Sequence, residues 1–281
     1  MVENPYEIPQ FARLAQALYF NTGLHMSQIQ AIDAVIDYRR SADVPQPFFI
    51  VDPVAVGATE YRTDQIQYLI EQGRPDLIKG NASEIMTLAG RAGGGKGVDS
   101  SPKGAEESVE AARVVADKYD CVVAITGGVD VVADKPSVSQ RVGRVSQDVK
   151  MLTKITGSGC AVGAVCAAAL TSSKGDPFLA TVTALAAVKQ AAREARHVAE
   201  GPGTLGVAIL DKLYRLSLSP DSLDCTTVTI DDPAAAAAAE AEAEAAQQES
   251  DPVEPADEND KTGGQGEGES PGKSKENGQK A

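Results

Sequence analysis

The chain has 281 residues, 42% of them hydrophobic, which suits one sizeable α/β domain with additional sequence. Its formal net charge is −14, and residues 231–281 contribute −10 of this through 14 acidic residues and four lysines. The remaining chain is only mildly acidic. This argues against nucleic acid as a partner, because binding to a phosphate backbone requires clustered Lys and Arg.

A membrane protein and a disulfide-stabilised protein are also disfavoured. No apolar run reaches the roughly 18 residues of a membrane-spanning helix, and the start of the chain lacks a basic-then-apolar signal pattern. The four cysteines have unrelated spacings, which fit neither a zinc site nor a disulfide framework. A reduced, cytoplasmic setting is the simplest interpretation.

The elements predicted in the first half of the chain alternate between strand and helix. Short apolar strands are predicted at 17–20, 47–51, 76–79 and 121–125, with helices from Ser27 and over 62–72 and 105–118. The glycine-rich stretch 91–104 is predicted to be a mobile loop. Such alternation is typical of a mainly parallel sheet with helices on both faces.

The second half is predicted to add a hairpin and a group of helices. The hairpin strands are expected at 129–133 and 137–142, a further strand at 149–155, helices at 160–172, 176–199 and 201–216, and a last strand at 226–230. Residues 231–281 have almost no apolar content, so we expect a folded domain over 1–230 and a disordered acidic tail over 231–281.

Polar side chains follow several of the predicted strands. Asp52 stands at the end of the second strand, where open α/β sheets place their chemistry, although it could simply cap the following turn. Lys79 could meet a phosphate or be solvated. Asn81 and Glu84 have the spacing of a capping box, and that structural role explains Glu84 fully.

The loop 156–160 runs directly into an apolar segment of helical length. Gly157 and Gly159 allow a sharp turn and a close backbone approach, and the free N–H groups of the helix point into the loop. Such a terminus can hold a phosphate, and it favours the thiolate form of Cys160. A buried helix preceded by a glycine turn is the alternative interpretation of the same stretch.

Five blocks resemble the signatures of the hydroxyethylthiazole kinase family, in the family's order and approximate spacing. Residues 52–59 with Arg62 and Thr63 are similar to DPV-x-x-GAT-x-x-R, and 79–85 are similar to R/K-G-N-x-x-E-I. The other blocks are 97–100, 125–130 and 156–160. The pattern is closest to the fungal form, which is usually the C-terminal half of a bifunctional thiamine-biosynthesis protein.

The resemblance implies a ribokinase-like, three-layer α/β fold and phosphorylation of 4-methyl-5-(2-hydroxyethyl)thiazole with Mg-ATP. It also implies a homotrimer with active sites between subunits. By position, Asp52 and Glu84 would help to hold Mg²⁺, and Lys79, Asn81 and Thr126 would bind ATP.

The thiazole side of the site is assigned in the same way. Gly157 would border the thiazole, and Cys160 would take the place of the aspartate base of ribokinase relatives. Phosphoryl transfer relies mainly on positioning and charge stabilisation, so a strong base is not required. The family's first strand and helix have no counterpart here, and Met1 falls near the family's substrate-contacting methionine.

Two classes of function follow from this N-terminal difference. The first is a thiazole kinase of thiamine biosynthesis, with a relative acting on another small alcohol as a lesser option. The second is an inactive or weakened fragment of a bifunctional protein, which binds nucleotide or partner subunits without turnover. A missing strand is expected to leave a sheet edge exposed and the pocket open on one side.

Overall fold

The computed structural model describes residues 4–23, 26–91, 102–146, 149–173 and 175–240. The chain divides into two compact units, residues 1–238 and 239–281. The first unit contains all the strands and helices named below. Met1, the block 97–100 and most of the predicted tail lie outside the described residues.

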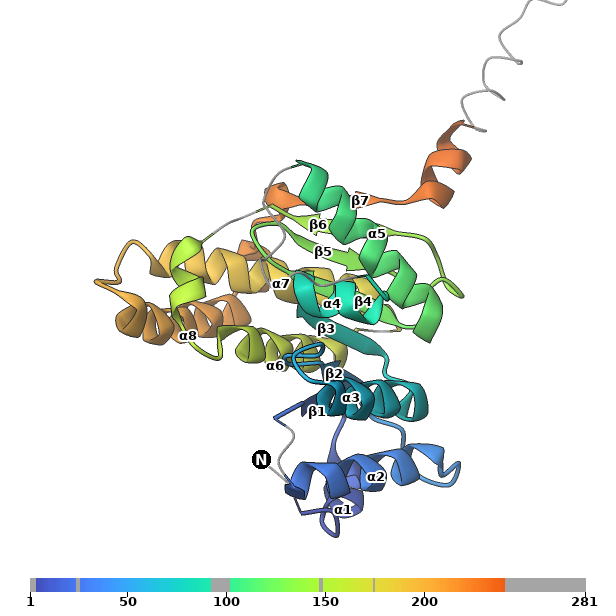
Figure 1. Ribbon diagram of the computed structural model, residues 1–281. Coiled ribbons are helices and arrows are strands. Elements are labelled where there is room, and N and C mark those ends of the chain that lie inside the picture. Colours follow the sequence, from blue (N-terminus) through green and yellow to red (C-terminus); the bar gives the residue numbers. More distant parts are fainter. Residues whose placement is uncertain (1–3, 24–25, 92–101, 147–148, 174, 241–281) are drawn as a thin grey trace, which may run out of the picture. The chain divides into compact units, whose positions relative to one another are not determined.

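A seven-stranded sheet forms the centre of the first unit, with its strands in chain order from one edge to the other (Figure 1). The first four strands pair in parallel, and each later pairing is antiparallel. The strands are β1 (Ala17–Asn21), β2 (Phe48–Asp52), β3 (Leu77–Asn81), β4 (Val122–Thr126), β5 (Asp130–Ala133), β6 (Val142–Val145) and β7 (Val228–Asp231).

Helices connect the parallel strands, and further helices come after β6 in the chain. Those of the parallel half are α1 (Ile8–Leu14), α2 (Met26–Arg40), α3 (Glu60–Gly73), α4 (Ala82–Leu88) and α5 (Pro102–Tyr119). Those that follow the antiparallel strands β5 and β6 are α6 (Ser158–Leu170), α7 (Pro177–Ala195) and α8 (Pro202–Leu218). Short 3₁₀ segments are η1 (Lys150–Lys154), η2 (Pro220–Ser222) and η3 (Cys225–Thr227).

The alternation of strand side chains assigns the helices to two faces. Phe49 and Val51 pack with α1 to α5 on one face, whereas Ile50 packs with α6 and α7 on the other. Successive parallel strands here advance in one direction across the sheet. Right-handed crossovers therefore place their helices on the same face. The expected three-layer α/β arrangement is confirmed, with an antiparallel half added to the parallel one (Figure 1).

Helix α8 lies outside this sandwich, against α7 and η1. Leu205 and Ile209 of α8 share a small core with Ala191 and Ala195 of α7 and with Val149. The predicted strand over 149–155 is therefore wrong. Its β-branched residues favour a strand, but packing beneath α8 selects a 3₁₀ turn in which Leu152 N donates to Val149 O at 2.8 Å.

The second hairpin strand also differs from its prediction. It spans Val142–Val145, whereas the sequence predicts a strand over 137–142. The preceding residues turn instead, because the N–H groups of Val138 and Ser139 donate to the carbonyl oxygen of Lys135. The loop of the hairpin is therefore longer than the sequence predicts, and its second strand begins later in the chain.

Strand β1 lies at one edge of the sheet and pairs only with β2 among the strands described. All five of its residues are half-buried, which is unusual for a parallel strand. At the opposite edge, Asp231 closes β7, and residues 233–238 beyond it are helical. Within the described ranges, no helix has the length and apolar character needed to cross a membrane.

Candidate active site

A buried ion pair joins two neighbouring strands at their carboxyl ends. Lys79 Nζ of β3 lies 3.0 Å from Asp52 Oδ2 of β2, and both side chains are 3% exposed. The same Nζ donates to the carbonyl oxygen of Gly159 in α6 at 2.8 Å. The ammonium therefore connects the Asp52 block, the Lys79 block and the Gly157 loop, three stretches that the sequence predicts to converge.

Tyr19 completes this network from β1. Its hydroxyl lies 2.8 Å from Asp52 Oδ2 and 3.0 Å from the carbonyl oxygen of Cys160, and its one proton can serve either acceptor. Asn21 Nδ2 donates to the same hydroxyl at 3.2 Å. Burial, followed by the nearby Asp52 carboxylate, raises the pKa of Tyr19 above its ordinary value, so the hydroxyl keeps its proton.

Gly163 makes room for the tyrosine ring on α6. A Cβ at Gly163 would lie 2.4 Å from the Tyr19 hydroxyl oxygen and 2.5 Å from its Cζ, both impossible contacts. The tyrosine and the glycine therefore fit each other in size. Together with Lys79, this contact holds the first turns of α6 against the ends of β1 and β2.

The N-terminus of α6 presents free backbone donors at this point. Gly157 is its N-cap, at φ +84°, a left-handed conformation that glycine adopts without strain. Gly159 and Cys160 lie in the first turn, where N–H groups have no carbonyl partner within the helix. Aligned peptide dipoles add partial positive charge there, so the turn can stabilise an anion. The Cys160 side chain is half-buried and forms no disulfide.

The predicted capping box is present at the start of α4. Asn81 Oδ1 accepts from Glu84 N at 2.9 Å, and Glu84 Oε2 accepts from Asn81 N at 2.7 Å. Glu84 Oε1 also accepts from Ala55 N at 2.9 Å, which fixes the loop after β2. Burial raises the pKa of Glu84, although these two backbone bonds act in the opposite direction. Thr126 lies level with Asn81 in the β3–β4 register.

The oxygen ligands at these strand ends fit a magnesium ion. Asp52 Oδ2 accepts from Tyr19 and Lys79, whereas within the described ranges no group donates a hydrogen bond to Asp52 Oδ1. Each Glu84 oxygen accepts one backbone N–H and keeps a second lone pair. Mg²⁺ usually takes one or two carboxylates plus waters and substrate phosphates, so two carboxylates suffice. Across the described parts of the chain, no group of three His, Cys, Asp or Glu residues is arranged to hold a metal alone.

The structure thus brings Asp52, Lys79 and the 157–160 turn into direct contact, and it places Asn81 and Thr126 side by side. Met1 lies outside the described residues, so its predicted place at the thiazole has no structural counterpart here. Cys121 and Cys166 are fully buried, as expected for core residues, and burial raises the pKa of both thiols.

The sequence does not reveal two polar side chains that act inside the protein, the half-buried Tyr19 and the buried Lys189. Tyr19 reads as core because it stands between Leu18 and Phe20 in an apolar strand. Lys189 reads as a solvated charge, yet its Nζ lies 3.1 Å from Asp130 Oδ1 inside the protein. The one available signal for Lys189 is its position as a single charge among the buried apolar residues of α7.

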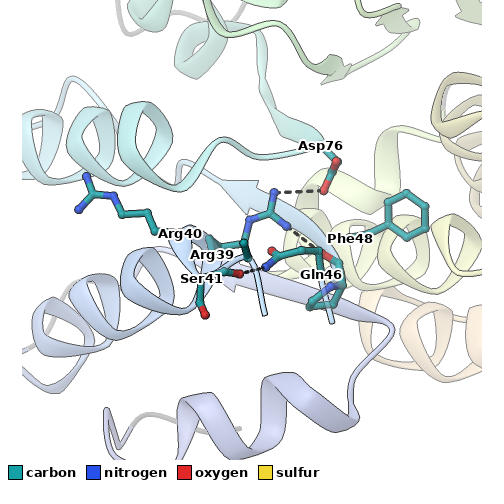
Figure 2. A pocket seen from close by; sticks show the side chains of 8 residues that line it. Arg39, Arg40, Ser41, Gln46, Phe48 and Asp76 are labelled. Carbon is teal, nitrogen blue, oxygen red and sulfur yellow. Dashed lines mark hydrogen bonds and ion pairs between the residues drawn. The ribbon is translucent and has the colours of Figure 1, made fainter. Parts of the chain in front are cut away.

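Two cavities lie at the amino ends of the parallel strands, away from the candidate site at their carboxyl ends. The smaller, of about 440 Å³, is bordered by Phe48 of β2 and by Arg39, Arg40, Gln46 and Asp76 (Figure 2). Arg39 donates to the carbonyl oxygens of Gly73, Pro47 and Arg74, so its guanidinium ties α2 to the neighbouring loops. The charged side chain of Arg39 at this cavity is therefore explained by its structural role in holding these loops.

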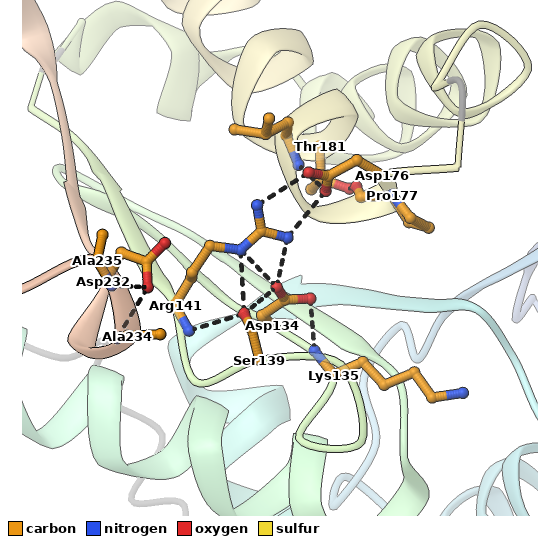
Figure 3. Close-up of polar contacts among 11 residues, drawn as sticks. Asp134, Lys135, Ser139, Arg141, Asp176, Pro177, Thr181, Asp232, Ala234 and Ala235 are labelled. Carbon is orange, nitrogen blue, oxygen red and sulfur yellow. Dashed lines mark hydrogen bonds and ion pairs between the residues drawn. The ribbon is translucent and has the colours of Figure 1, made fainter. Parts of the chain in front are cut away.

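The larger cavity, of about 850 Å³, includes an arginine clamp (Figure 3). Arg141 contacts Asp134 at 2.6 Å and Asp176 at 2.8 Å, and its guanidinium lies 4.5 Å from the centre of the Phe178 ring. Hydrogen bonding to Asp176 raises the pKa of Arg141, and the pKa of Asp176 is lowered. The guanidinium balances one of the two carboxylate charges and joins the residue before β6 to the N-cap of α7.

Comparison with known proteins identifies the family. Residues 1–219 match the model of the hydroxyethylthiazole kinase family. The hydroxyethylthiazole kinases of Cronobacter sakazakii and Clostridium novyi are 41% and 39% identical to this chain over 215 and 217 residues. These alignments cover 76% and 77% of this chain, and 77% and 78% of the relatives.

A solved structure also shares the fold. The hydroxyethylthiazole kinase of Pyrococcus horikoshii matches with a TM-score of 0.66 and 28% identity, covering 83% of each chain. The family model spans most of the sequence, and both bacterial relatives exceed a third in identity. Together with the contacts among the motif residues at the carboxyl ends of the parallel strands, these matches show that the chain belongs to the hydroxyethylthiazole kinase family.

Proposed function

We propose that this kinase transfers a phosphoryl group from Mg-ATP to the primary hydroxyl of 4-methyl-5-(2-hydroxyethyl)thiazole, in thiamine biosynthesis or salvage. The observation that carries the proposal is the Lys79 ammonium, which contacts both Asp52 and the Gly159 carbonyl oxygen. Three motif blocks meet at that one group, because its two partners lie 27 and 80 residues away from Lys79 in the sequence.

The proposed roles follow the chemistry of each side chain. Lys79, Asn81 and Thr126 would bind ATP, and Asp52 and Glu84 would hold Mg²⁺, which would neutralise phosphate charge. The free N–H groups at the start of α6 would stabilise negative charge on the transferred group. Binding and charge stabilisation by these groups would supply most of the rate enhancement.

The acceptor end of the site is assigned to α6 and to the chain's start. Gly157 and Met1 would border the thiazole, and Cys160 would face its hydroxyl group. The hydroxyl oxygen would bond to the γ-phosphorus as the bond to the ADP oxygen breaks, and its proton would leave toward Cys160. A homotrimer, a cytoplasmic location and the fungal form of the family belong to the same proposal and rest on the sequence blocks.

The test is phosphorylation by the purified chain. Protein, ATP, Mg²⁺ and the thiazole are incubated, and the thiazole phosphate is detected by phosphorus NMR and mass spectrometry. Pyridoxal replaces the thiazole as a control alcohol, and EDTA replaces Mg²⁺. We expect thiazole phosphate only in the complete mixture. Tight Mg-ATP binding without any product would support the second candidate, a non-catalytic nucleotide-binding protein. In a separate measurement, light scattering coupled to gel filtration would give the oligomeric state.

A further inference from the structure

Lys189 is a buried cation that the proposed chemistry does not use. It lies in α7, its side chain is 7% exposed, and its helix neighbours Val188 and Ala191 are buried and apolar. An ammonium in such surroundings is costly unless it is paired and its protons are hydrogen-bonded. Its contacts therefore indicate what it does.

These contacts converge on the turn between β4 and β5. Lys189 Nζ lies 2.8 Å from the Gly128 carbonyl oxygen, 3.1 Å from that of Gly127 and 3.1 Å from Asp130 Oδ1. The carbonyl oxygen of Val145 lies 3.3 Å away, so the four acceptors exhaust the three ammonium protons. Asp130 Oδ1 also accepts from Gly127 N at 2.8 Å.

The bonds from Lys189 fix the direction of two peptide groups. In a trans peptide, the carbonyl oxygen and the following N–H point in opposite directions. With the Gly127 and Gly128 carbonyl oxygens turned toward Lys189, the N–H groups of Gly128 and Val129 point away from it. Two adjacent glycines have little conformational preference of their own, so an external anchor decides this orientation.

The turn follows directly on Thr126. Thr126 is the last residue of β4, lies level with Asn81 across β3, and donates to the Gly80 carbonyl oxygen at 3.3 Å. Two N–H groups that point away from Lys189, immediately after Thr126, would be available to donate to an anion at the carboxyl ends of these strands. Their orientation would govern how well a phosphate of ATP is held there.

We propose that Lys189 is a positioning residue for nucleotide binding: it holds the Gly127 and Gly128 carbonyl oxygens and so aims the following N–H groups at ATP. The inference rests on the proposed function, because it assumes that ATP lies beside Thr126. Lys189 itself does not contact ATP. Asp130 serves as the counter-ion that allows the lysine to be buried.

The experiment compares Lys189→Met with the double variant Lys189→Met/Asp130→Asn. The single variant leaves a buried carboxylate unpaired and is expected to be unstable. The double variant removes both charges, and the amide introduced by Asp130→Asn keeps an oxygen for Gly127 N, so stability is restored without the carbonyl anchors. Arg141→Gln is the matched control, since it breaks an ion-pair cluster at the other edge of the sheet.

Two readouts separate positioning from a purely structural role. We expect the double variant to bind ATP about tenfold more weakly in calorimetry, the effect of roughly one well-formed hydrogen bond. Amide hydrogen exchange is expected to accelerate in a peptide covering 126–130 and to stay unchanged in α3 and α5. Arg141→Gln should lose stability and keep its ATP affinity.

The proposal is overturned if the stable double variant binds ATP as the parent does, or if Arg141→Gln loses the same affinity. It is also overturned if the parent protein does not bind ATP. A parent that binds ATP but leaves the thiazole unmodified refutes the proposed function alone, and the affinity and exchange measurements then still decide the role of Lys189.

Discussion

Lys79 Nζ lies 3.0 Å from Asp52 Oδ2, and both side chains are almost completely buried. Neither charge has bulk water to solvate it, so each depends on the other and on the Gly159 carbonyl oxygen and the Tyr19 hydroxyl. The pair therefore makes the local fold and the proposed ATP site interdependent. An ATP phosphate that approaches Lys79 would compete with the Asp52 carboxylate for the ammonium protons.

Lys79→Met is expected to reduce the free energy of unfolding by about 3–5 kcal/mol, because it leaves the Asp52 carboxylate buried and unpaired. The double variant Lys79→Met/Asp52→Asn removes the unpaired charge and should recover part of that loss. Urea unfolding followed by circular dichroism measures both effects. A single variant as stable as the parent would mean that Asp52 reaches water despite its burial.

Much of the fold can be predicted from local sequence. The parallel strands are predictable because short apolar runs end in polar residues such as Asp52 and Asn81, and the capping box of Asn81 and Glu84 is wholly local. The strand predicted over 149–155 is wrong because its conformation is decided by α8, some 50 residues later in the chain.

Within the candidate site, only residues on neighbouring parallel strands can be predicted from the sequence to lie together. Asp52 is the last residue of β2 and Lys79 lies two residues before the end of β3, so parallel pairing brings them together. Tyr19 cannot be identified from the sequence, because its role depends on the space that Gly163 leaves on a helix of the opposite layer. Lys189 depends in the same way on carbonyl groups about 60 residues earlier.

Gly163→Ala is expected to be strongly destabilising, because its methyl group would lie within 2.4 Å of the Tyr19 hydroxyl oxygen. Overpacking of this kind typically costs about 1–3 kcal/mol. In a Tyr19→Leu background the ring is gone, and Gly163→Ala should cost much less. A double-mutant cycle by thermal unfolding measures the coupling; equal costs in both backgrounds would show that contact with Tyr19 is not what makes Gly163→Ala destabilising.

Cys160→Ser is expected to lower kcat for thiazole phosphorylation and to leave the melting temperature nearly unchanged, since thiol and hydroxyl are similar in size. Cys160→Asp should retain or raise kcat, because a carboxylate is ionised at neutral pH and is available as a base. Steady-state kinetics with saturating Mg-ATP provides the measurement. Cys166→Ser serves as the buried cysteine control, and an unchanged kcat in Cys160→Ser would remove Cys160 from the mechanism.

Asp130 supplies a prediction about pH. Burial raises its pKa to about 6, against the opposing effect of the Lys189 ammonium. The folded protein then binds a proton at Asp130 between about pH 4 and 6, where an unfolded chain has already released it. The stability that Asp130 contributes is therefore greatest below about pH 4 and declines as the pH rises to about 6.

Asp130→Asn removes this titration and provides the comparison. Urea unfolding of parent and variant at about pH 4.5, 5.5, 6.5 and 7.5 gives the difference in their free energies of unfolding. We expect the parent to lose stability relative to the variant as the pH rises toward about 6, and the difference to level off above that pH. Because other carboxylates titrate equally in both proteins, their effect cancels. A difference that is constant over the whole range would mean that Lys189 keeps Asp130 ionised even at the lowest of these pH values.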